Sequence, residues 1–187
     1  MLPFRYAHAA ADDWNDVLSI VIDQLGFGGA TLGFVYVTDA INAHLDEILD
    51  SLRESTGVEH WIGAVGIGIC ATGIEYYEKP AIAAMLADFP EDSFRVFPSI
   101  IKDLDDFDQA QSAWLGNAQP YIGLVHADPI NPLTESLVKQ LAARTATGFL
   151  IGGLASAGDN ARVIADGVSE GGVSGVMFTE AVRCRPA

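Results

Sequence analysis

The chain has 187 residues, of which half are apolar and 19% are charged. This length suits one domain with a sizeable core, and the apolar content excludes a chain that is mainly disordered. With 25 acidic and 10 basic residues, the formal net charge is −15. Basic residues gather only at Arg183 and Arg185, so we expect neither nucleic acid nor an anionic membrane as a partner.

The N-terminal segment favours a cytoplasmic protein. Met1–Ala11 lacks the charged start and apolar stretch of a secretory signal, and the sequence contains no uncharged apolar run long enough to span a bilayer. The two cysteines, Cys70 and Cys184, form neither a CxxC motif nor a disulfide framework.

The first half of the chain predicts a helix, then strands on either side of a second helix. Apolar residues of Ala9–Leu25 fall on one stripe at helical spacing, and Gly28 and Gly29 end that helix. The other elements are apolar or amphipathic runs bounded by turn residues. They are the strand Leu32–Val37, the helix opened by Asp39 and Asn42 and ended by Gly57, and the strands Trp61–Ile69, Ala81–Leu86 and Phe94–Ile101.

The second half predicts a similar series of elements. They are the helix Gln109–Leu115, the strand Tyr121–His126, the helix Pro132–Thr145, the strand Phe149–Leu154, and a final hairpin of Arg162–Asp166 with Val173–Thr179 around Gly171 and Gly172.

A repeat of the sequence underlies this similarity. Val35–Ile69 and Leu124–Gly158, 89 residues apart, share seven identities in 35 positions without a gap, where average composition would supply roughly two. We therefore predict one domain built from two copies, about 9–101 and 107–180. The fold class is α/β in a mixed α+β form. Central mixed sheets carry helices outside, and the copies are related by a pseudo-two-fold axis.

The ends of equivalent strands are the expected binding positions, because α/β sheets commonly hold ligands there. Asp39 and Asp128 each follow a buried strand and stand three residues ahead of Asn42 and Asn131. Either acid could reach into a cleft. Helix capping and turn formation are the structural alternative for these polar side chains.

Two stretches of small residues are the second candidate. Gly66, Cys70 and Thr72 lie in the first, and Gly152, Gly153 and Ser156 lie in the second. Neither has the spacing or the lysine of a phosphate-binding loop. Their small side chains either allow close backbone approach or leave open space, and we expect them to line a pocket.

The sequence supports catalysis and metal binding less strongly than it supports a binding pocket. Cys70, Thr72, Ser156 and His126 could supply a nucleophile and a base, but nothing in the sequence brings any two together. The four histidines show no metal-binding spacing, so we expect no metal and no cofactor. Glu75 lies in an acidic and aromatic cluster that is either an exposed hairpin or part of a cleft for an amino group.

Several of these stretches resemble the FIST N-terminal domain family. Ile62–Glu75 (IGAVGIGICATGIE) is similar to its strand signature, as are Ile151–Gly158 (IGGLASAG), Val163–Gly167 (VIADG), the GGVSGV run from Gly171, and Asp128–Pro129. The resemblance covers nearly the whole chain, 1–187, in its order of elements. It implies a sensory domain of bacterial signal transduction proteins that binds small ligands, amino acids among them, and it brings over no catalytic residues.

The resemblance also implies site residues and partners. Its strand-turn positions correspond here to Gly66, Cys70, Gly73, Glu75, Asp128, Gly152, Gly153 and Ser156. The family usually continues into a C-terminal FIST domain, so that domain or another chain is an expected partner, and a homo-oligomer is a further option.

We therefore expect a cytoplasmic sensory domain that binds a small molecule without catalysis. Asp39, Glu75, Asp128 and Ser156 are its expected polar groups, and the excess of acid favours a ligand with an amino group. One alternative is an interaction module that pairs through an exposed sheet edge. Another is a small hydrolase or transferase that uses Cys70 or Ser156.

Overall fold

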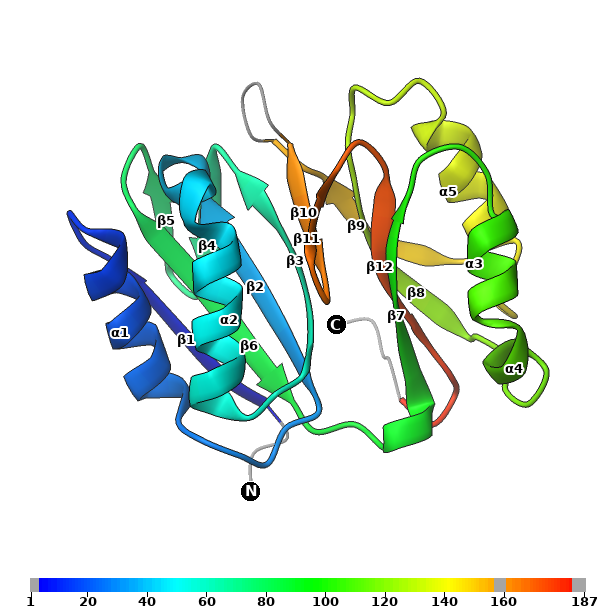
Figure 1. Ribbon diagram of the computed structural model, residues 1–187, viewed down its shortest axis with the longest axis horizontal. Helices are drawn as coiled ribbons and strands as arrows, with labels where there is room; N and C mark the ends of the chain where they lie inside the picture. The colour runs from blue at the N-terminus through cyan, green and yellow to red at the C-terminus, as the bar shows by residue number, and fades with distance from the viewer. Residues whose placement is uncertain (1–3, 157–160, 183–187) are drawn as a thin grey trace.

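The computed structural model describes residues 4–156 and 161–182 (Figure 1). Its strands form two mixed sheets and a separate hairpin. The first sheet has the order β1 (Phe4–Ala10), β6 (Ala81–Ala87), β2 (Leu32–Thr38), β3 (His60–Gly66), β10 (Arg162–Ala165) and β11 (Val168–Glu170). The second has the order β7 (Phe94–Ile100), β12 (Val173–Phe178), β8 (Ile122–Ala127) and β9 (Leu150–Leu154). The hairpin is β4 (Gly68–Ala71) with β5 (Ile74–Tyr77).

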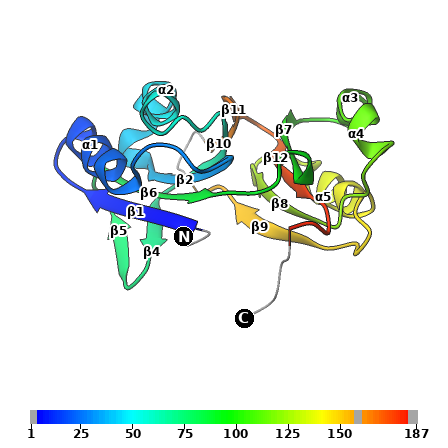
Figure 2. The same cartoon turned by 90° about the horizontal axis from the view of Figure 1, so that it is seen from below.

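The helices cover one face of each sheet. They are α1 (Trp14–Leu25), α2 (Leu45–Thr56), α3 (Asp105–Ala110), α4 (Ser112–Leu115) and α5 (Thr134–Ala142), with short 3₁₀ turns at Asp39–His44 and Glu91–Ser93. Figure 2 shows α1 and α2 on one side of the first sheet and the β4–β5 hairpin projecting from the other. The predicted class, mixed sheets with helices packed outside, is confirmed. None of the helices in the described ranges is long and apolar enough to cross a membrane.

Burial explains why these segments adopt their structures. In β2 all but one of the seven residues are buried, as expected for a strand with neighbours on both edges and layers on both faces. In α1 the buried residues Val17, Leu18, Val21 and Leu25 form one stripe. The Asp13 carboxylate accepts a hydrogen bond from the Asn15 amide at 2.8 Å and caps the start of that helix.

The two sheets share a strand order. β1–β6–β2–β3 and β7–β12–β8–β9 each contain two antiparallel pairs followed by one parallel pair. Phe34 pairs with Met85 in the first sheet, and Gly123 pairs with Met177 in the second. Position 123 lies 89 residues after position 34, and position 177 lies 92 residues after position 85, so both pairings follow the sequence repeat. Common descent of the two halves stays a prediction.

One hairpin from the second half of the chain lies in the first sheet. β10 pairs antiparallel with β3, and Ile164 lies opposite Gly63. In the β10–β11 turn, the Asp166 carboxylate accepts a hydrogen bond from the Trp61 amide at 2.9 Å. The second half therefore contributes strands to both sheets, and neither sheet is built from one half alone.

Two expectations for the first half need correction. The chain forms β1 before α1, whereas the sequence predicts a helix from Ala9. Phe4–Ala10 pairs with β6 along its whole length, so tertiary pairing sets its conformation. The predicted strand Trp61–Ile69 is divided at Ile67, where the chain turns from β3 into β4.

Two expectations for the second half also change. The predicted helix Gln109–Leu115 is replaced by α3 and α4, which begin four residues earlier at Asp105. The predicted hairpin of Arg162–Asp166 with Val173–Thr179 is wrong, because β10 turns back on β11 instead. Asp166 makes this turn with a positive φ of 56°, a conformation that Asp tolerates better than most residues. β7 belongs to the second sheet, beside β12.

Candidate functional site

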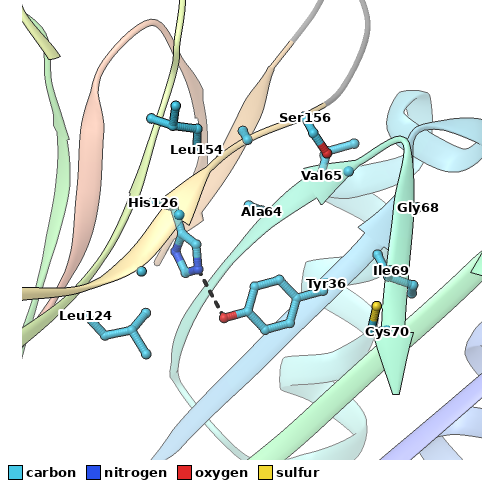
Figure 3. Close-up of a pocket in the computed structure, with 14 residues that line it drawn as sticks. Tyr36, Ala64, Val65, Gly68, Ile69, Cys70, Leu124, His126, Leu154 and Ser156 are labelled. Carbon is cyan, nitrogen blue, oxygen red and sulfur yellow. Dashed lines mark hydrogen bonds between the residues drawn. The ribbon is translucent and has the colours of Figure 1, made fainter. Parts of the chain in front are cut away.

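A cavity of about 380 Å³ lies between the two sheets (Figure 3). Its walls come from β2, β3 and β4 on one side and from β8, β9 and the residues after β9 on the other. The lining residues are Tyr36, Ala64, Val65, Gly66, Gly68, Ile69, Cys70, Leu124, His126, Gly152, Gly153, Leu154, Ala155 and Ser156. Both halves of the chain therefore build it.

A hydrogen bond between Tyr36 and His126 crosses the cavity wall. The Tyr36 hydroxyl lies 3.0 Å from His126 Nε2, and the two rings meet edge to face with centroids 5.4 Å apart (Figure 3). Tyr36 comes from β2 in the first sheet and His126 from β8 in the second. This contact joins the two sheets at the wall of the cavity.

His126 is buried, with 4% of its surface exposed. Burial lowers the pKa of His126 to about 4 and raises the pKa of Tyr36 above its ordinary value, so both groups are neutral near pH 7. A neutral imidazole has one N–H and one lone pair. If Nε2 accepts a hydrogen bond from the Tyr36 hydroxyl, Nδ1 carries the N–H; if Nε2 donates, Nδ1 carries the lone pair. Nδ1 has no hydrogen-bond partner among the described residues.

The glycines of the wall differ in what they allow. A Cβ at Gly152 would lie 1.8 Å from the Val125 carbonyl oxygen, and its φ is +144°, so this position requires glycine. A Cβ at Gly153 would meet no atom within 4 Å. Gly152 therefore serves packing of β9 on β8, whereas Gly153 leaves open space in the cavity.

Ser156 connects the two rims of the cavity. Its hydroxyl oxygen accepts a hydrogen bond from the Ile67 amide at 3.3 Å. Ile67 lies in the turn between β3 and β4, and Ser156 follows β9. The bond therefore holds the end of β9 against the turn that connects β3 of the first sheet to the β4–β5 hairpin.

A larger apolar groove of about 1040 Å³ adjoins the cavity. Tyr36, Cys70 and Leu124 line both hollows, which places the Tyr36 ring at their junction. The groove runs over the sheet face opposite α1 and α2, where Phe34, Met85 and other apolar side chains are not covered by a helix.

Most predicted site residues lie in these two hollows. Six of them line the cavity, namely Gly66, Cys70, His126, Gly152, Gly153 and Ser156. Thr72 lines the groove. The fold thus brings the two stretches of small residues together, although they are about 90 residues apart in the sequence. Their role in binding a ligand stays a prediction.

Three predicted acids lie elsewhere. Asp39, Glu75 and Asp128 line neither the cavity nor the groove. The Asp128 carboxylate accepts a hydrogen bond from the Ile130 amide at 2.8 Å and stabilises a turn. Glu75 is exposed on β5, and Asp39 begins a 3₁₀ turn. None of these three acids therefore belongs to the polar wall of the cavity or the groove, and a role for them in binding stays a prediction.

Tyr36, the residue that joins the cavity to the groove, is not among the site residues predicted from the sequence. Its signal is a single hydroxyl within the apolar run Leu32–Val37, which also suits an ordinary strand tyrosine. Leu124 and Leu154 were likewise missed, since one apolar residue in a strand cannot be told from another without the fold.

The described residues of this site include few side chains suited to nucleophilic catalysis or metal binding. Cys70 is an exposed free thiol. In Figure 3 the Tyr36 ring lies between this thiol and the His126 imidazole. Within residues 4–156 and 161–182, no group of three or more His, Cys, Asp or Glu side chains is placed to hold a metal ion.

Comparison with known families gives one match. The model of the FIST N domain matches residues 31–187, which include every residue that lines the cavity. The chain belongs to the FIST N domain family. Membership implies a sensory domain of signal transduction proteins. No curated protein matches the chain significantly.

Proposed function

We propose that this FIST N domain senses a small molecule, which binds without catalysis in the cavity between the two sheets of a cytoplasmic signalling protein. The observation that carries the proposal is the cavity itself, which both sheets line and whose wall holds the hydrogen-bonded pair Tyr36 and His126. A mostly apolar hollow with a few placed polar groups is typical of a small-molecule site.

The size and lining of the cavity support this proposal. Its volume of about 380 Å³ falls within the roughly 300–1,000 Å³ typical of small-molecule sites. The wall is mostly apolar, with the polar atoms of Tyr36, His126 and Ser156 at separate points. Such a lining binds by apolar contact and orients the ligand through a few hydrogen bonds.

The arrangement of reactive groups favours binding over catalysis. The Ser156 oxygen accepts an amide hydrogen bond from Ile67, and His126 Nε2 meets Tyr36. Neither of these contacts joins Ser156 or Cys70 to a base, which acyl transfer by either nucleophile would require. Membership in a family of sensory domains agrees with a site that binds without turnover.

A pocket-filling variant tests the proposal. Thermal unfolding of the wild type is followed against neutral and charged metabolites, including the twenty amino acids that the family resemblance suggests. A ligand at 100 times its Kd should stabilise the fold by about 2.7 kcal/mol. Gly153→Leu, which places a side chain in the open space, should remove the shift. Gly167→Leu is the control, because a Cβ there also meets nothing within 4 Å and Gly167 lies outside the cavity.

The outcomes separate binding in the cavity from binding elsewhere. A shift that Gly153→Leu abolishes and Gly167→Leu retains supports the proposed function. No shift with any compound, or an equal shift in both variants, contradicts it.

A second candidate function rests on the edge of the second sheet. β9 is an edge strand, with Ile151 46% and Leu154 61% exposed. Exposed apolar edges pair readily with another strand, and a second copy of this chain is the proposed partner. Light scattering over a concentration series should then show a dimer that Ile151→Lys disrupts. A monomer at every concentration would exclude this function.

A further inference from the structure

We infer that the cavity and the groove together bind an uncharged amphipathic molecule, whose hydrogen-bonding head meets Tyr36 and His126 and whose apolar body extends along the groove. The inference rests on the proposed function and names the class of ligand. It differs from the expectation of an amino-bearing ligand that the acidic composition suggests.

The lining of the cavity argues against a charged head. None of its fourteen residues is Asp, Glu, Lys or Arg. Among these fourteen described residues the titratable side chains are Tyr36, Cys70 and His126, and burial disfavours the ionised forms of Tyr36 and His126. A charged group that leaves water without a counter-charge loses solvation that the site does not return. A zwitterionic amino acid would lose solvation at both of its charges.

The donors and acceptors at the head position suit a neutral group. If Tyr36 donates to Nε2, the Tyr36 oxygen can still accept a hydrogen bond from a ligand. If Nε2 carries the hydrogen and donates to Tyr36, the Tyr36 hydroxyl hydrogen is free to donate to a ligand. A primary amide can both donate and accept, so it matches either tautomer. A carboxylate can only accept, and an ammonium can only donate.

The groove provides room for an apolar body beyond the head. It is about 1040 Å³ in volume, and Tyr36 and Leu124 line both it and the cavity. The lining residues that the structure describes include no Lys or Arg, and Asp88 is the one acidic residue among them. Phe34, Met85 and Ile151 supply apolar surface along it. A molecule with an alkyl or aromatic body would displace water from this surface, and each buried CH₂ contributes about 0.8 kcal/mol.

A cationic ligand is the strongest competitor, because the formal net charge of −15 attracts cations to the molecule as a whole. That attraction acts at long range and is screened at physiological salt. Among the described residues that line the cavity, none carries a carboxylate that could pair with an ammonium group. The local loss of solvation therefore decides against the cation.

Three probes with the same alkyl chain test the inference. Octanamide, octanoate and octylammonium carry a neutral, an anionic and a cationic head, and their Kd values are measured by calorimetry at pH 7.5 in 150 mM salt. We expect octanamide to bind at least tenfold more tightly than either charged probe. Gly153→Leu should abolish octanamide binding, and Gly167→Leu should leave it unchanged.

Tyr36→Phe locates the head group. Loss of one hydrogen bond is worth about 1 kcal/mol, so the variant should weaken octanamide binding about fivefold. It should change octanoate and octylammonium binding less. Unaltered octanamide binding in this variant would overturn the assignment of the head to Tyr36 and His126, and Gly153→Leu still tests the cavity if Tyr36→Phe fails to fold.

The remaining outcomes distinguish the inference from the proposed function. If octanoate or octylammonium binds as tightly as octanamide, and Gly153→Leu removes that binding, the cavity is a ligand site but the uncharged class is wrong. If none of the three probes binds, the uncharged class is also wrong. The proposed function fails as well only if the metabolite panel gives no shift or an equal shift in both glycine variants.

Discussion

His126 is the residue on which the interpretation of the site depends. It lies on β8 between Ser174 of β12 and Gly153 of β9, and it faces Tyr36 of β2. None of these neighbours carries a formal charge. The low pKa of His126, about 4, is therefore caused by burial and not by a neighbouring cation. The fold keeps this imidazole neutral.

Stability should consequently depend on pH through His126. The unfolded chain binds a proton at this histidine near pH 6.5 and the folded chain only near pH 4, so the neutral form stabilises the fold above 6.5 and this contribution is lost as pH falls. Between pH 7 and pH 5 the wild type should lose about 2 kcal/mol more unfolding free energy than His126→Gln. Urea titrations at both pH values measure the difference.

The other titratable groups of the chain are common to both proteins in that comparison and cancel in the difference. Equal losses in the two proteins would show that His126 is not held neutral by the fold.

At the scale of elements, one glycine in each sheet determines how closely the two strands of its parallel pair pack. Gly63 on β3 and Gly152 on β9 are 89 residues apart and belong to the identities of the repeat. A Cβ on Gly63 would lie 1.7 Å from the Val35 carbonyl oxygen, and a Cβ on Gly152 would lie 1.8 Å from that of Val125. In each sheet the glycine lets one parallel strand approach the backbone of the other.

Alanine at these glycines should therefore destabilise the fold through a backbone clash. We expect Gly63→Ala and Gly152→Ala each to lose about 3 kcal/mol or more, the upper end for overpacking, because a carbonyl oxygen cannot rotate away as a side chain can. Gly153→Ala, one residue further along β9, should stay within about 0.5 kcal/mol of wild type. Chemical denaturation measures all three, and similar midpoints for Gly152→Ala and Gly153→Ala would contradict the geometry.

For the whole molecule, the placement of β10 has the largest consequence. β10 and β11 follow β9 in the chain but extend the first sheet beside β3. β12 then returns to the second sheet between β7 and β8. Since the chain passes through both sheets in this way, the site between them forms only when both are folded.

We therefore expect the two sheets to unfold in a single transition. Hydrogen-exchange labelling across a urea series should give one midpoint for peptides from β2 and from β8. Asp166→Gly keeps the positive φ of the β10–β11 turn but removes the bond to the Trp61 amide, and it should cost about 1–3 kcal/mol. Both midpoints should fall together. A lower midpoint for β2 alone would show that the sheets unfold independently.

The sequence alone determined the elements whose signal is local. The strands that begin at Leu32, Ala81 and Phe94 are found close to their predicted bounds, because apolar residues and flanking turn residues mark them. The small residues of both stretches lining the cavity were also predicted, since their lack of side-chain volume can be read from the sequence.

Only the tertiary structure decided the site and the partners of the strands. The pairing of β10 with β3 depends on a contact between segments about 100 residues apart, and no local pattern encodes it. Tyr36 and His126 meet for the same reason. The Asp128 carboxylate bonds the Ile130 amide in a local turn and does not line the cavity, because short-range hydrogen bonds compete with a role in a distant site. The amino-acid sequence determines which small and polar side chains are present. The packing of one sheet against the other determines which of them line the same cavity.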